Sequence, residues 1–66
     1  MHIIVNGKER ECGNGITLAD LLVASGLRPE AVVVERNGDI VPAPAFAATG
    51  LMDGDRLEIL QFVGGG

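Results

Sequence analysis

The sequence ends in three glycines, Gly64, Gly65 and Gly66, and the carboxylate at this end is the group best suited to chemistry. Glycine has no Cβ, so its backbone samples conformations that other residues avoid and can approach another chain closely. Three extended residues reach about 10 Å, far enough to enter a narrow slot in a partner. Chain ends are also commonly frayed without any function. The rest of the sequence must decide between a reactive end and a frayed one.

Other candidate reactive groups are few. Cys12 is the single cysteine, so no internal disulfide can form, and its surroundings favour a packed thiol over a reactive one. His2 is the single histidine, and one histidine with one cysteine does not make a metal site. We therefore expect no catalytic residue, no metal and no bound cofactor. A chain of this kind is suited to be a substrate of other enzymes.

Composition narrows the class of protein. The 66 residues make one small domain, too small to enclose a deep active site, and 47% of them are hydrophobic. The net charge is −4 with five scattered basic residues, which does not fit nucleic-acid binding. No apolar run approaches the length of a membrane span. Because the sequence has neither paired cysteines nor a signal peptide, we expect a cytoplasmic protein.

Turn signals divide most of the chain into strands. Asn6-Gly7 and Asn37-Gly38 each predict a type I′ hairpin turn, because this dipeptide accepts positive φ at both positions. A further turn is expected at Asp53-Gly54-Asp55. The expected strands cover residues 2–5, 8–12, 31–36, 39–41 and 56–63.

One helix is expected over residues 17–25. Thr17 and Asp20 have the spacing of a capping box, and Gly26 stands where the helix must end in a left-handed conformation. Pro29 prevents any continuation. The apolar face consists of Leu18, Leu21 and Leu22.

The remaining segment and the order of elements predict the fold. Two prolines within residues 42–45 remove backbone donors, so this segment is expected to be a loop, anchored by Phe46. A hairpin, a helix, two strands, a loop and a final strand predict an α+β fold with the helix on one face of a mixed sheet. If the last strand pairs with the first, the fold is a β-grasp of four to five strands. The expected domain covers residues 1–63, with a glycine tail over 64–66.

The last predicted strand has two different faces. Side chains alternate along a strand, and Leu57 and Ile59 are expected to face the core below the helix. Leu60 and Phe62 then project from the opposite face, immediately before the glycine end, where they would form a docking patch for a partner. Two ordinary alternatives remain: residues 42–52 cover this face, or the two side chains are exposed without a function.

Several segments match a known pattern when they are taken together. They cover residues 4–7, 17–22, 34–42, 53–59 and 62–66. The combination of Asn37-Gly38 with Ile40, Val41 and Pro42, followed by the terminal glycines, is the most specific part. On these segments the whole chain resembles the ThiS family, the ubiquitin-like sulfur carriers of thiamin biosynthesis.

The resemblance implies a carrier cycle centred on Gly66. A ThiF-like enzyme would use ATP to convert its carboxylate to an acyl-adenylate, and sulfur from a persulfide enzyme would convert this to a thiocarboxylate. A ThiG-like thiazole synthase would then take the sulfur. Val63, Gly64 and Gly65 would form the tail that partners bind, and the chain itself would not be an enzyme.

The sequence departs from the family at two places. Residues 43–46 read Ala-Pro-Ala-Phe, where members often have a charged stretch and a tryptophan, and Phe46 is expected to fill the pocket of that tryptophan. Gly64 is a third terminal glycine and is expected to add reach to the tail.

Three alternative functions remain open for this sequence. They are the small subunit of molybdopterin synthase, a β-grasp interaction module that carries no sulfur, and ubiquitin-like attachment to lysines.

Overall fold

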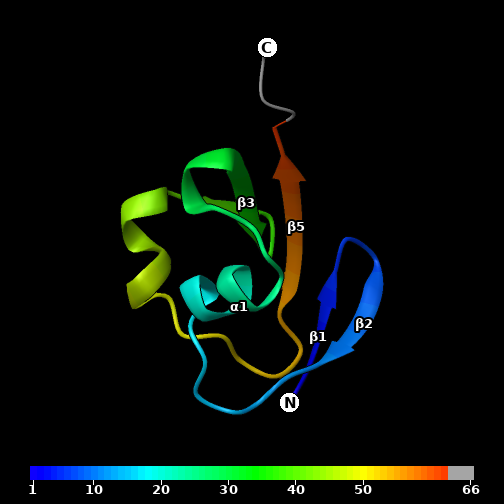
Figure 1. Ribbon diagram of the computed structural model, residues 1–66. Helices are drawn as coiled ribbons and strands as arrows, with labels where there is room; N and C mark the ends of the chain where they lie inside the picture. Colours follow the sequence, from blue (N-terminus) through cyan, green and yellow to red (C-terminus); the bar gives the residue numbers. More distant parts are fainter. Residues whose placement is uncertain (63–66) are drawn as a thin grey trace.

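In a computed structural model of the protein, in which residues 1–62 are described, one helix crosses one face of a five-stranded mixed sheet (Figure 1). The strand order across the sheet is β2-β1-β5-β3-β4. The elements are β1 (His2–Val5), β2 (Lys8–Glu11), α1 (Leu18–Ala24), η1 (Pro29–Ala31), β3 (Val32–Arg36), β4 (Asp39–Val41), η2 (Ala43–Ala48) and β5 (Arg56–Gln61).

The last strand lies in the middle of the sheet. β5 pairs in parallel with β1 and antiparallel with β3, while β2 and β4 form the two edges. The two edge strands join their neighbours through hairpins whose turns contain Asn6 (φ 51°) and Asn37 (φ 52°), each followed by a glycine with positive φ. Both predicted Asn-Gly turns are therefore confirmed, and the topology is that of a β-grasp.

The helix begins and ends as its sequence predicts. The Thr17 hydroxyl accepts a hydrogen bond from the Asp20 amide at 3.1 Å, and the Asp20 carboxylate accepts one from the Thr17 amide at 2.9 Å. At the other end Gly26 has φ +72°, and the Leu27 amide donates to the Leu22 carbonyl at 2.9 Å. These contacts are a capping box and a Schellman ending, so α1 stops after seven residues.

Some predicted boundaries are wrong. Residues 43–48 form the 3₁₀ helix η2 and not a loop, because a proline that cannot join a strand is well suited to the first turn of a helix. A second short 3₁₀ helix, η1, precedes β3, which therefore begins at Val32. β2 ends at Glu11, one residue early, and β5 ends at Gln61.

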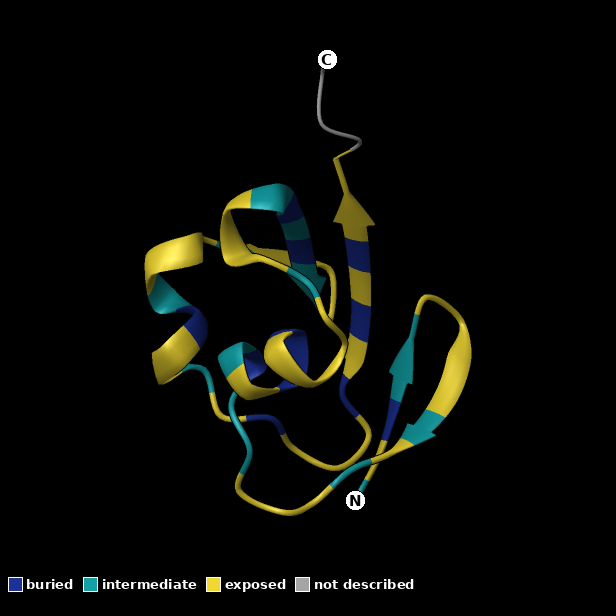
Figure 2. Cartoon of the chain, in the orientation of Figure 1, coloured by how far each residue is buried: buried dark blue, intermediate teal, exposed yellow. Residues whose placement is uncertain are grey.

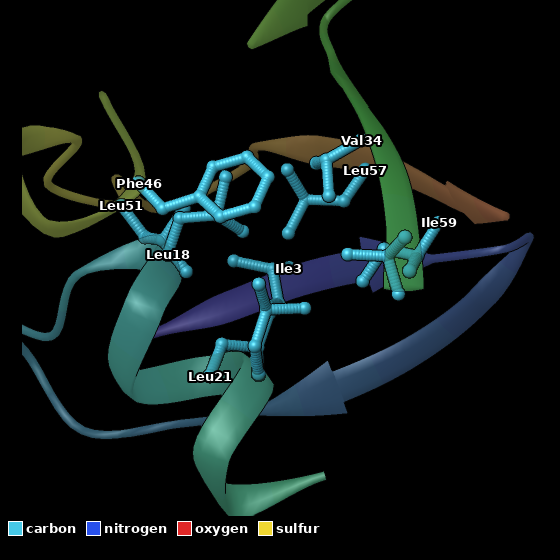
Figure 3. Packing of buried hydrophobic residues seen from close by; sticks show 10 residues of the cluster. Ile3, Leu18, Leu21, Val34, Phe46, Leu51, Leu57 and Ile59 are labelled. Atoms are coloured by element: carbon cyan, nitrogen blue, oxygen red, sulfur yellow. The ribbon is translucent and has the colours of Figure 1, made fainter. Parts of the chain in front are cut away.

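The hydrophobic core lies between α1, η2 and the inner face of the sheet (Figure 3). Phe46 is buried there, which confirms it as the anchor of its segment, and Cys12 packs partly buried at the margin. The buried residues of the core are Ile3, Leu18, Leu21, Leu22, Val32, Val34, Phe46, Leu51, Leu57 and Ile59. The core thus fixes which face of each strand remains outside.

Candidate functional site

The central strand β5 presents different side chains to its two faces. Leu57 and Ile59 are buried in the core, whereas Leu60 is 64% exposed and Phe62 is 58% exposed. Figure 2 shows buried and exposed residues alternating along most of β5. The predicted assignment of the two faces is therefore confirmed. Two large apolar side chains stand on the face opposite the helix, at the end of β5 that leads toward the glycines.

Among residues 1–62, no other element covers this patch of Leu60 and Phe62. The η2 segment packs against α1 and inserts Phe46 into the core, so it lies on the helix side of the sheet. The alternative that residues 42–52 cover the patch is therefore wrong. Leu60 lies opposite Val33 on β3, and Ile40 on the edge strand β4 is also exposed on this face.

Hydrogen bonds fix the start of β5 at the turn that precedes it. Asp55 is only 5% exposed, and its carboxylate accepts hydrogen bonds from the Met52 amide at 2.8 Å, Asn37 Nδ2 at 3.0 Å and Arg36 Nε at 3.0 Å. Asn37 Oδ1 in turn accepts from the Arg56 amide at 2.9 Å. Burial raises the pKa of Asp55, but the hydrogen bonds from Met52, Asn37 and Arg36 outweigh it, so the pKa is lowered from 3.8.

The shift in the pKa of Asp55 predicts how stability depends on pH. Because the folded pKa lies below the unfolded value, the carboxylate stabilises the fold above the unfolded pKa and loses this effect as pH falls through the folded pKa. We expect Asp55→Asn to cost about 1–3 kcal/mol near neutral pH, with the difference from wild type shrinking under acid. Urea unfolding across an acidic pH series measures this. The control is Asp39→Asn, which removes an exposed carboxylate; equal pH profiles for wild type and Asp55→Asn would contradict the assignment.

A second turn holds β5 from its other side. Asn6 Oδ1 accepts a hydrogen bond from the Ile59 amide at 2.7 Å, and Asn6 Nδ2 donates to the Ile59 carbonyl at 3.1 Å. In the sequence, Asn6 and Asn37 were explained only by the positive φ of a type I′ turn, and neither side-chain role was predicted. The repeated use of asparagine before glycine is compatible with such roles but does not identify their partners.

The remaining predicted site residues lie at the end of the chain. Val63, Gly64, Gly65 and Gly66 are outside the described residues, so the tail and its modified carboxylate stay predictions. Within residues 1–62, no group of three or more His, Cys, Asp or Glu side chains is arranged to hold a metal ion. No helix in the same part of the chain is long and apolar enough to cross a membrane.

The β-grasp sheet, with an exposed apolar strand face leading to terminal glycines, defines a ubiquitin-like protein. The pattern of the ThiS family matches residues 3–66. A crystal structure of the thiamine biosynthesis protein ThiS from Geobacter metallireducens superposes with a TM-score of 0.84 at 39% identity, covering 100% of both chains. The chain therefore belongs to the ThiS family.

Curated relatives fall into two groups by length. The sulfur carrier protein ThiS of Bacillus subtilis is 42% identical over 50 residues, which is 76% of each chain. A thiazole synthase of Paramagnetospirillum magneticum is 42% identical over 66 residues, covering 100% of this chain. This chain spans only 20% of the length of that thiazole synthase.

Proposed function

We propose that this chain is a sulfur carrier of thiamin biosynthesis whose Gly66 carboxylate is converted to a thiocarboxylate. The observation that carries the proposal is the exposed pair of Leu60 on the central strand and Phe62 just after it, close in sequence to the glycine end of a ThiS-family chain. A partner that binds this pair is aligned with the end it must modify. The docking patch and the reactive group are thus neighbours in sequence.

The chemistry explains why partners are needed. A carboxylate is a poor electrophile, so its oxygen must first attack ATP and displace pyrophosphate, giving an acyl-adenylate. The terminal sulfur of a persulfide then attacks the acyl carbon and AMP leaves with its electron pair. A second thiol cleaves the resulting acyl disulfide, which releases the thiocarboxylate and leaves a disulfide on the donor side. In this scheme a ThiF-like enzyme performs the adenylation. The carrier supplies the carboxylate that accepts the adenylyl group and then the sulfur, and the surface that the enzyme binds.

In the delivery step, the thiocarboxylate gives its sulfur to a ThiG-like thiazole synthase. A relative named as a thiazole synthase contains a segment similar to this whole chain, which supports a close relation between carrier and synthase. Val63, Gly64 and Gly65 would form the tail that the partner binds, and the two glycines can enter a narrow channel because they have no side chain. ATP is bound by the activating partner, and the free thiol of Cys12 fits a reducing cytoplasm.

The direct test is the intact mass of the protein after incubation with a ThiF-like enzyme, ATP and a sulfur source. We expect a gain equal to the exchange of one oxygen for one sulfur, and no gain when ATP is omitted. A mass that stays unchanged under all conditions contradicts the carrier function. Masses of conjugates to other proteins would instead indicate ubiquitin-like attachment to lysines.

A further inference from the structure

The first turn of the chain continues the pairing of β5 past the point where β1 ends. The β1 strand ends at Val5, which pairs with Leu57, and the Asn6 amide donates to the Leu57 carbonyl at 2.9 Å. Gly7 then turns the backbone away into β2. Two residues farther along β5, the Asn6 side chain takes over and binds both the amide and the carbonyl of Ile59. It thereby extends the pairing of β5 beyond the last residue of β1.

Ile59 needs these contacts because it is buried. A buried backbone amide or carbonyl that lacks a partner destabilises the fold, and water has little access to Ile59. On its other side β5 stays paired with β3, where Gln61 lies opposite Val32 and the Phe62 amide donates to the Ala31 carbonyl at 2.8 Å. The strand is therefore held from both sides up to Ile59, and beyond that residue from the β3 side.

We propose that Asn6 is a positioning residue for the sulfur-transfer reaction, because its grip on Ile59 fixes the direction in which β5 leads toward the glycine end. The inference depends on the proposed carrier function. It adds Asn6, which is 53 positions away from Ile59 in sequence, to the residues that this function requires. Asn6 touches no reacting atom in this scheme. It acts through Leu60 and Phe62, whose placement decides whether docking and delivery of the carboxylate occur together.

Loss of the Asn6 contacts to β5 should weaken binding of the carrier to the adenylating enzyme and leave the rate of the adenylation step unchanged. When Ile59 loses its partners on one side, the residues after it sample more conformations, and the partner must order them on binding. Fixing even one residue costs enough to change an equilibrium about fivefold or more. Once the end is bound, the adenylation step belongs to the partner. The expected signature is therefore a higher KM for the carrier at an unchanged kcat.

The structure offers a matched control in the second Asn-Gly turn. Asn6 and Asn37 have φ values of 51° and 52°, each precedes a glycine, and each holds β5 through its side chain. Asn37 binds the start of the strand, through the Arg56 amide and Asp55, whereas Asn6 binds nearer its end. Asn6→Gly and Asn37→Gly thus each remove two side-chain hydrogen bonds, the first set beyond the middle of β5 and the second at its start.

The experiment measures steady-state carrier-dependent adenylation by a ThiF-like enzyme, as pyrophosphate release, for wild type and both variants well below their melting temperatures. We expect Asn6→Gly to raise KM about fivefold with kcat unchanged, and Asn37→Gly to leave KM unchanged even if it lowers the melting temperature more. Hydrogen exchange of the Phe62 amide should also accelerate in Asn6→Gly alone. Equal KM values for Asn6→Gly and wild type, equal increases in both variants, or unchanged exchange at Phe62 would each overturn the inference.

Two further outcomes are decisive. If Asn6→Gly lacks a cooperative thermal transition, Asn6→Asp replaces it, because aspartate tolerates positive φ and keeps an acceptor for the Ile59 amide while losing the donor to its carbonyl. A KM raised above that of Asn37→Gly then supports the inference, and an equal KM overturns it. Failure of the wild-type protein to be adenylated contradicts the proposed function itself, and the role of Asn6 falls with it.

Discussion

Adding one alanine after Gly66 is expected to abolish ATP-dependent thiocarboxylation completely while leaving the fold intact. The extension moves the carboxylate by about 3.3 Å and places a methyl group in a channel suited to glycine. Both changes remove the near-attack geometry on which adenylation depends, and effects of this kind reach a hundredfold for a displacement of about 1 Å. Intact mass spectrometry after incubation with the activating enzyme, ATP and a sulfur source measures the result.

The control for this extension is the removal of Gly64, which shortens the chain but keeps a Gly-Gly end. We expect this variant to accept sulfur, at a reduced rate if the third glycine supplies reach. Thermal unfolding of both variants should match that of wild type, because the altered positions follow the last residue of β5 in sequence and the core is built from earlier residues. If the alanine-extended protein still gains sulfur, the reaction does not require the carboxylate of Gly66.

Replacing Leu60 or Phe62 with aspartate is expected to weaken binding to the adenylating enzyme by about tenfold to a hundredfold, equivalent to about 1.4 to 3 kcal/mol. Both side chains are exposed in the free protein, so the new carboxylate is hydrated there. In the complex it would be dehydrated against an apolar surface without a partner, which is unfavourable. Isothermal titration calorimetry with the purified enzyme measures the affinity.

Two variants distinguish a docking defect from a folding defect. Val23→Asp adds the same charge at a residue of α1 that is 75% exposed, and we expect it to leave the affinity unchanged. Ile59→Asp places the charge in the core and is expected to remove the cooperative thermal transition. Loss of that transition in Leu60→Asp and Phe62→Asp would show that these residues stabilise the fold, and normal binding by both would exclude the patch as a docking site.

Local sequence signals predicted most of the fold. The capping box of Thr17 and Asp20, the helix end at Gly26 and the two Asn-Gly turns depend on contacts between residues close in sequence, and the structure contains all of them. The alternation along β5 likewise separated the buried side chains from Leu60 and Phe62. These features could be predicted because each is determined by a few neighbouring residues.

Other features depend on contacts distant in sequence and were missed. The side-chain amide of Asn6 is hydrogen-bonded to Ile59, which is 53 positions away in sequence. The side chains of Asn37 and Asp55 are hydrogen-bonded although they are 18 positions apart, so no local pattern indicates either pair. The 3₁₀ helix η2 was predicted as a loop because its prolines argue against a strand but not against a helical turn. Of the candidate site, the exposed strand face could be predicted from alternation, whereas the residues that hold the strand could not.

The central place of β5 has a consequence for the order of events during folding. β5 is the last strand of the sheet in sequence, yet it is the neighbour that joins β1 to β3. Until it is inserted, the two hairpins cannot join into one sheet, and the apolar pair Leu60 and Phe62 has no rigid support. Closure of the sheet around β5 is therefore required before Leu60 and Phe62 can be presented together on one ordered surface.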